Sequence, residues 1–202
     1  QLPYYLSAFG GVLPDGYSYS GYARQGFFEL CGVAVLDLMV IFIAGVLAKR
    51  NENGRKPVAV RIYSAVFSLI TILLICSAMS KMIMYIGEYG LTGLRFYTSW
   101  FMILLGIVFL VLILHEIFPG MKTVATLFIS FTVMFGALCF CDPDARIAQY
   151  NVESYLSGEI AETDTGSLAM LSEGAAPYVE RLRDSDSAYY NCCNRVLITM
   201  KE

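Results

Sequence analysis

The sequence has little charge and only one histidine. Of its 202 residues, 15% are charged and 57% are hydrophobic, whereas about 25% of the residues of an ordinary soluble domain are charged. The histidine, His115, stands in HEIFP, which lacks the second histidine that a zinc protease helix carries four residues on. Neither a Gly-x-Ser-x-Gly elbow nor a phosphate-binding loop occurs. These absences argue against the common hydrolases and nucleotide-binding enzymes, and the composition indicates a membrane protein.

The apolar segments contain few acidic residues, and the chain has no patch in which basic and aromatic residues alternate. An intramembrane aspartyl protease needs two acids at matching depth, but Asp37 is the only acid near the middle of an apolar run. Nucleic-acid binding is typical of clustered Lys and Arg with interleaved aromatic residues, and the chain has no such patch. We therefore expect no catalytic residue, no cofactor and no nucleic-acid partner.

Four apolar segments are long enough to span a bilayer, for which a helix needs about 20 residues. The predicted fold is all-α, an integral membrane helical bundle with four transmembrane helices and a small helical C-terminal tail. No cleavable signal peptide opens the chain. Because the first residue is Gln1 rather than Met, we expect a truncated start, with residues 1–25 as an extramembrane lead and room for further transmembrane helices before it. The predicted transmembrane domain covers 26–141, with spans at about 26–48, 58–80, 96–114 and 123–141.

Positive charge predicts an orientation in the membrane. The connector at 49–57 carries Lys49, Arg50, Arg55 and Lys56, and loops rich in Lys and Arg stay in the cytoplasm. Alternation of the spans then places the tail, residues 142–202, on the opposite side of the membrane. We therefore predict a cytoplasmic 49–57 loop and an extracytoplasmic tail.

The tail differs from the rest of the chain in charge. Residues 142–202 carry eleven acids and five bases, whereas the preceding residues carry six acids and nine bases. Asp142 can cap a helix that begins at Pro143 and ends near Leu156, because proline is tolerated in a first turn. Two short helical patterns follow, SLAMLSEG and APYVERLRD. We expect an acidic, soluble tail whose first helix has only a weak apolar face, formed by Ile147, Tyr150 and Tyr155.

Polar residues within two spans predict how those helices pack. Ser64, Ser68 and Thr71 recur at helical spacing, and Ala78 follows one heptad after Thr71; such a stripe of small residues lets membrane helices approach closely. Asp37 would cost about 2.5 to 3.5 kcal/mol in the membrane if left unpaired. It could face a wet cavity, bond to Ser68 or Thr71, or be protonated. Both a structural hydrogen bond and a proton-binding role stay open.

The connector YIGEYGLTGLR, residues 85–95, is the most polar stretch between two spans. If the chain stayed helical, five residues around it would share one face, although its three glycines also permit a bent or re-entrant path. One interpretation is a charged rim with an aromatic belt. The other is a ligand or ion vestibule, which Glu29 would join through an ion pair at the same depth. The five residues are Lys81, Tyr85, Glu88, Thr92 and Arg95.

Three blocks of sequence resemble a known family. YARQGFFEL at 22–30, EYGLTGLRFYTSWFM at 88–102 and DPDARIAQYNVESYL at 142–156 are similar to recurring blocks of a bacterial polytopic membrane family, domain of unknown function 4173, which is related to domain 4153. The likeness runs from about Tyr17 to Pro177 and implies a membrane location but no reaction. We expect the membrane to be the bacterial inner membrane. The chain departs from the family in having Gly93 where an acid commonly follows YGLT, which weakens any role for that acid here.

Six cysteines allow more than one interpretation. Cys139 and Cys141 end the fourth span, and Cys192 and Cys193 lie near the C-terminus. Their spacing is poor for zinc, which favours C-x₂₋₄-C, so we expect no metal site. Free thiols are the default. A disulfide from Cys141 to Cys192 or Cys193 is the alternative if the tail is extracytoplasmic.

Three function classes remain. We favour a non-catalytic membrane component that binds a partner or senses an envelope signal, with the lipid bilayer and a protein partner or a second copy as its contacts. The alternative is a transporter or channel-like protein that uses Asp37 and the Lys81, Glu88 and Arg95 rim. An enzyme acting on lipid-linked substrates, with Glu29 or Glu88 as base and Arg95 as an anion clamp, is the third.

Overall fold

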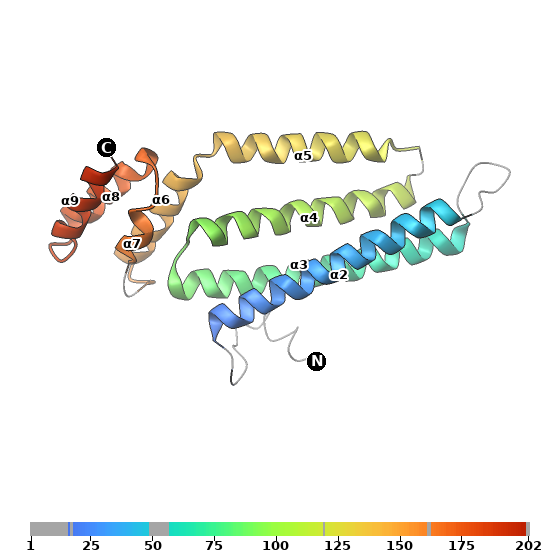
Figure 1. Cartoon of the computed structure of the whole chain (residues 1–202), viewed down its shortest axis with the longest axis horizontal. Helices are drawn as coiled ribbons and strands as arrows, with labels where there is room; N and C mark the ends of the chain where they lie inside the picture. The colour runs from blue at the N-terminus through green and yellow to red at the C-terminus, as the bar shows by residue number, and fades with distance from the viewer. Residues whose placement is uncertain (1–15, 17, 49–56, 119, 161–162, 201–202) are drawn as a thin grey trace. The chain divides into compact units, whose positions relative to one another are not determined.

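Long apolar helices dominate the structure, a computed structural model that describes residues 16, 18–48, 57–118, 120–160 and 163–200. The described residues form helices and no strand, which confirms the all-α prediction. Four of the helices are long and apolar enough to cross a membrane, so the chain is a multi-pass membrane protein. They are α2 (Tyr19–Leu47), α3 (Val58–Tyr89), α4 (Gly93–Ile117) and α5 (Thr123–Phe140) (Figure 1).

The first three of these helices extend beyond the spans expected from hydropathy. Helix α2 begins at Tyr19, inside the predicted lead, because Ser18 caps it by accepting a hydrogen bond from the Gly21 N–H at 3.1 Å. Helix α3 has 32 residues and is about 48 Å long at 1.5 Å per residue, so its ends project from a hydrocarbon core of about 30 Å. Most of the lead and residues 49–56 of the predicted cytoplasmic loop lie outside the described residues.

Two compact units make up the chain. The first consists of residues 1–82 and 100–134, and the second of residues 83–99 and 135–202. Helices α3, α4 and α5 each contribute residues to both units.

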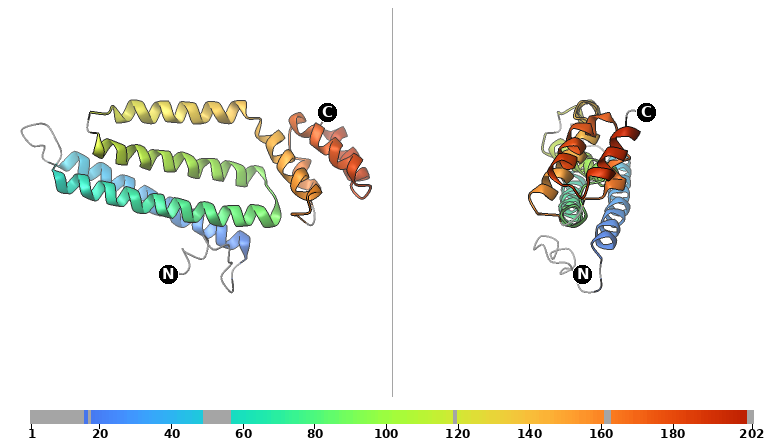
Figure 2. Two further views of the ribbon diagram at one scale, coloured as in Figure 1. Left: turned by 180° about the vertical axis from the view of Figure 1, so that it is seen from behind. Right: turned by 90° about the vertical axis from the view of Figure 1, so that its left-hand side faces the viewer.

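Neighbouring helices of the first unit run antiparallel. On α2 and α3, an early residue of one helix contacts a late residue of the other, and the same holds for α3 with α4 and for α4 with α5 (Figures 1 and 2). The pairs that show it are Tyr22 with Lys81, Arg61 with Glu116, and His115 with Thr123. Between α4 and α5, the indole N–H of Trp100 also donates to the Met134 carbonyl at 3.3 Å.

Small and hydroxyl side chains lie where α3 packs. Ser64, Ser68, Thr71 and Ala78 are all buried, so the predicted packing stripe is confirmed. Helix α5, in contrast, has no buried residue within the described chain, and many of its side chains are exposed.

The second unit contains a small helical bundle, which we call the tail domain. Its first helix, α6 (Pro143–Leu156), has the predicted bounds. It is followed by α7 (Thr165–Leu168), η2 (Glu173–Ala175), α8 (Ala176–Ser185) and α9 (Tyr190–Thr199). Helix α8 packs on α6 and α9 (Figure 2). The sequence analysis did not predict α9 or the shared core, which consists of Ala148, Val152, Leu168, Ala175, Val179, Leu182, Cys193, Val196 and Leu197.

Two carboxylates fix the start of the tail domain. The Asp142 side chain caps α6 as predicted, accepting from the Ala145 N–H at 3.3 Å. The Asp144 carboxylate accepts from the Ser172 N–H at 3.0 Å, which ties the segment before α8 to the first turn of α6. Gly174 comes so close that a Cβ there would lie 2.3 Å from an Asp142 carboxylate oxygen. The DPD stretch therefore has a structural use.

Candidate functional site

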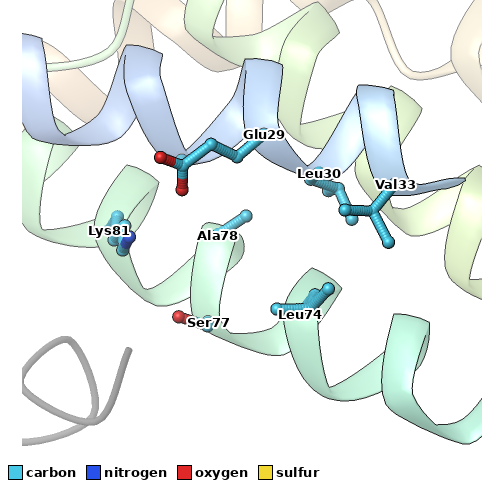
Figure 3. A pocket seen from close by; sticks show the side chains of 8 residues that line it. Glu29, Leu30, Val33, Leu74, Ser77, Ala78 and Lys81 are labelled. Carbon is cyan, nitrogen blue, oxygen red and sulfur yellow. The ribbon is translucent and has the colours of Figure 1, made fainter. Parts of the chain in front are cut away.

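A charged cavity lies between α2 and α3. Its lining includes Glu29 from α2 and Lys81 from α3, together with Ser77 and apolar side chains. Glu29 reaches from α2 toward the turn of α3 that carries Lys81 (Figure 3). The cavity volume is about 20 Å³, which holds about one water molecule and no larger solute.

The two charged groups are held differently. One carboxylate oxygen of Glu29 accepts from the Gln25 side chain at 2.8 Å, while the other, Oε2, is buried with no hydrogen-bond partner among the described residues. Lys81 is only 1% exposed. Its ammonium lies 4.3 Å from the centre of the Tyr22 ring, a cation–π contact worth about 0.5 to 2 kcal/mol.

Gly26 makes the buried position of Lys81 feasible. A Cβ on Gly26 would lie 2.8 Å from Cδ of Lys81 and 3.3 Å from its Nζ, so a larger residue would force the lysine side chain to move. Tyr22 and Gly26 were not predicted as site residues, although both belong to the block YARQGFFEL. A glycine on the same helical face as a glutamate, one turn before it, is the signal that marks the close approach.

Asp37 lies deeper on the same pair of helices. Asp37 is 8% exposed and is hydrogen-bonded to the Thr71 hydroxyl of α3. Thr71 was one of the two partners that the sequence analysis weighed; the other, Ser68, is fully buried, and its hydroxyl has no hydrogen-bond partner among the described residues. The predicted hydrogen bond is therefore present, and the proton-binding role stays a prediction.

The residues expected to form one polar face separate into different environments. Lys81 points to Tyr22 of α2, whereas Arg95 stacks over Tyr85, with the guanidinium 3.9 Å from the ring centre. The Arg95 guanidinium also donates to the Tyr89 carbonyl at 3.0 Å and to the Gly90 carbonyl. It thereby caps the C-terminus of α3, where backbone carbonyls carry partial negative charge.

Glu88 and Thr92 complete the connector. Glu88 is exposed near the end of α3, and Thr92 is half-buried just before α4. The Thr92 carbonyl accepts the first helical hydrogen bond of α4, from the Phe96 N–H at 2.9 Å. The chain therefore stays helical through Tyr89 and turns over three residues, rather than following a re-entrant path.

Asn151 of α6 holds that turn. Its Oδ1 accepts from the Leu91 N–H at 2.6 Å, and its Nδ2 donates to the Leu91 carbonyl at 2.7 Å. Gly90 has a φ of 75°, and a Cβ there would lie 2.8 Å from Asn151 Oδ1, so glycine is needed for both conformation and space. Asn151 was not predicted as a site residue. Its position one turn after Ile147 and three residues after Ala148, both buried, was the available signal.

The cysteines of the described chain are free thiols. Cys141 and Cys192 are exposed, while Cys193 is fully buried in the core of the tail domain, and burial raises the pKa of its thiol. No disulfide joins the cysteines of the described residues, and the alternative bridge from Cys141 to Cys192 or Cys193 stays a prediction. Within the described residues, no group of three His, Cys, Asp or Glu side chains could hold a metal ion.

Comparison with known families agrees with the resemblance seen in the sequence. The family model "Domain of unknown function (DUF4153)" matches residues 1–182; it is the relative that the resemblance named beside domain 4173. Curated proteins and solved structures gave no match to this chain. Since the matched region covers most of the chain, the protein belongs to the DUF4153 family.

Proposed function

We propose that this protein is a non-catalytic component of the bacterial inner membrane whose tail domain binds a protein partner on the extracytoplasmic side, as part of sensing an envelope signal. The observation that carries the proposal is the pair of hydrogen bonds between Asn151 and Leu91. These bonds join the tail domain to the connector between two membrane helices. A partner that binds the tail domain would therefore act on the ends of α3 and α4.

The tail domain presents the surface that such a partner needs. Its residues are net acidic, with eleven acids against five bases over 142–202. Three apolar side chains of the tail domain are well exposed: Met170 at 88%, Tyr190 at 51% and Ile198 at 61%. Aromatic residues and methionine are enriched in protein contact surfaces, and the acidity of the tail favours a basic partner.

The uses of the polar residues support a non-catalytic role. Arg95, the anion clamp of the enzyme hypothesis, directs its guanidinium to the carbonyls at the end of α3 and to the Tyr85 ring. The Glu29 carboxylate is held by Gln25 in a cavity with room for one water molecule. The Arg95 guanidinium is thus engaged by protein groups, and the cavity beside Glu29 is smaller than a lipid-linked substrate.

In-cell photo-crosslinking tests the proposal. A photoreactive amino acid is placed at Met170, and a matched control carries it at Phe140 of α5, which is 92% exposed at the end of an apolar helix. We expect a discrete crosslinked protein band from position 170 that is absent from position 140. The substitution Ile198→Glu, on the exposed face of α9, should remove that band while the chain remains folded.

The mass of the crosslinked band distinguishes a second copy of this chain from a different protein partner. A band at twice the mass of the chain indicates a second copy, whereas any other single mass identifies a different protein. Identical patterns from positions 170 and 140, or a band from position 170 that is insensitive to Ile198→Glu, would contradict a binding surface on the tail domain.

A second candidate function is supported by the charged groups between α2 and α3. Glu29, Lys81 and Asp37 are ionisable groups on one pair of membrane helices, as expected of a transporter or channel-like protein. The cavity holds about one water molecule, so the transported species would be a proton or a small ion. Purified chain in liposomes should then carry flux that the Asp37→Asn, Glu88→Gln double variant reduces; unchanged flux would exclude this candidate.

A further inference from the structure

The contact between Asp37 and Thr71 bears on whether the Asp37 carboxyl group carries a proton. The Thr71 hydroxyl oxygen lies within hydrogen-bond distance of two acceptor oxygens: a carboxyl oxygen of Asp37 and, at 3.1 Å, the Phe67 carbonyl. A hydroxyl has one hydrogen to donate, and a carbonyl oxygen can only accept. A helical threonine commonly donates to the carbonyl four residues earlier. When the Thr71 hydrogen points to Phe67 in this way, the contact with Asp37 is a hydrogen bond only if Asp37 donates to Thr71. Only a protonated carboxyl group can do so.

Charged groups on the same helices are far from Asp37. On α2 the nearest is Glu29, eight residues away, and on α3 both Arg61 and Lys81 are ten residues from Thr71, so each lies about 12 Å or more along its helix. The nearest thiols are those of Cys31 on α2 and Cys76, which is exposed on α3.

The other two membrane helices bring no compensating charge. Glu116 and His115 are at the end of α4 that contacts Arg61, and Arg95 is near the opposite end of that helix. Helix α5 has no charged residue. An ionised Asp37 would thus lack a cationic partner within the described chain, at a cost of about 2.5 to 3.5 kcal/mol or more, whereas a neutral acid avoids that cost.

We propose that Asp37 is a neutral carboxylic acid at neutral pH and that Asp37 with Thr71 is a proton-binding site of the α2–α3 interface. Loss of the proton to water leaves a carboxylate. Thr71 then turns its hydrogen from the Phe67 carbonyl to Asp37, and the buried charge loosens the contact between the two helices. This goes beyond partner binding by the tail domain and does not depend on it.

Infrared spectroscopy of the full chain in lipid bilayers tests the proposal. The wild-type spectrum at neutral pH should contain a carboxylic acid C=O stretching band that disappears in Asp37→Asn, whose amide can still donate to Thr71. In Thr71→Val, which keeps the side-chain shape but removes the hydroxyl, the band should remain and move to higher frequency. Glu29→Gln is the matched control and should leave the band in place.

Two results would overturn the proposal. One is a difference spectrum between wild type and Asp37→Asn that contains carboxylate stretching bands and no acid band at neutral pH. The other is an acid band whose frequency does not change in Thr71→Val. The second variant keeps Asp37 itself, so the test remains decisive even if Asp37→Asn fails to insert.

Discussion

Lys81 is a buried lysine that lies close to Gly26, where the absence of a side chain leaves room for it. The lysine is 1% exposed and lies against the Tyr22 ring. A lysine in such a place gives up most of its hydration, and the cation–π contact and the Glu29 carboxylate in the shared cavity offset part of that cost. The close approach at Gly26 therefore leaves room for the lysine side chain in this position.

Gly26→Ala should destabilise the α2–α3 pair. The new Cβ would lie 2.8 Å from Lys81 Cδ, so the lysine side chain would have to move. Because Lys81 is buried against the Tyr22 ring, we expect that movement to cost about 1–3 kcal/mol, as crowding in a packed site does. Gly32→Ala on the same helix is the matched control, because nothing lies within 4 Å of the position that its new methyl group would occupy. Both variants gain the same helix propensity, so their unfolding free energies in mixed detergent micelles should differ by about 1–3 kcal/mol. Equal stability of the two variants would contradict this account of Gly26.

Tyr155 and Asp186 form a hydrogen bond of 2.6 Å in the tail domain. This bond and the Ala188 N–H lower the pKa of Asp186, and the Asp186 carboxylate raises the pKa of Tyr155 to about 12. The stabilisation is complete above the usual aspartate pKa of about 4 and is lost as the pH falls through the lowered value. It is also complete below the usual tyrosine pKa of about 10 and is lost as the pH rises toward the raised value.

Tyr155→Phe should therefore destabilise the tail domain most between about pH 5 and pH 9, with the difference from wild type shrinking outside that range. Exposure of Cys193, which is fully buried in the tail core, reports the unfolding of this domain. It can be followed with a pyridyl disulfide in full chains that lack the other five cysteines. Tyr190→Phe, a change on an exposed ring, is the control. A Tyr155→Phe effect that does not vary with pH would refute the assignment.

At the scale of the elements, the turn between α3 and α4 is held by α6 rather than by its own sequence alone. Asn151 supplies both an acceptor and a donor to Leu91. In Asn151→Ala both backbone groups of Leu91 lose their partners, which costs about 1–3 kcal/mol for each group that stays buried. Hydrogen–deuterium exchange of residues 85–95 should then become about tenfold faster or more, since 1.4 kcal/mol corresponds to a factor of ten.

An intermediate variant and a control variant accompany Asn151→Ala. Asn151→Asp keeps the acceptor and loses the donor, so its exchange rate should lie between those of wild type and Asn151→Ala. Asn191→Ala, an exposed position on α9, should leave exchange in the connector unchanged. If Asn151→Ala also left it unchanged, the clamp would not hold the turn.

The elements also show what the sequence could reveal. Helix α6 was predicted with its observed bounds because an aspartate cap and a first-turn proline are local signals. Helix α9 was missed because YNCCNRVLIT has weak propensity and is stabilised by tertiary packing of Cys193, Val196 and Leu197. Hydropathy located the four spans but not their ends, since a helix continues past the bilayer wherever caps and neighbours allow it.

Some residues of the candidate site could likewise be predicted from the sequence, and others could not. Asp37 and Thr71 could be paired from the sequence because both are polar residues at similar depth in apolar helices. Tyr22, Gly26 and Asn151 could not, because their roles depend on which helix faces which, and no local pattern specifies that. The polar face from Lys81 to Arg95 failed as one surface because the helix ends at Tyr89, so the helical spacing does not continue through the turn.

At the scale of the whole molecule, the order of the membrane helices predicts which parts share a side of the membrane. One crossing, α4, separates Glu88 from Lys122, and a second crossing, α5, separates Lys122 from the tail domain. Glu88 and the tail domain are therefore expected on the same side, with Lys122 opposite. The basic residues of the 49–57 connector favour the extracytoplasmic side for the tail domain.

Cysteine labelling in intact cells tests this topology. Glu88, Lys122 and Glu180 are exposed, and each is replaced by cysteine in a chain that lacks the six native cysteines, with valine at position 193 to fill the tail core. An impermeant maleimide should label positions 88 and 180 in intact cells and position 122 only after lysis. The reverse pattern would place the tail domain in the cytoplasm and move its proposed partner there. Different sides for positions 88 and 180 would mean that α4 and α5 do not both cross the bilayer, because two crossings must return the chain to the side from which it started.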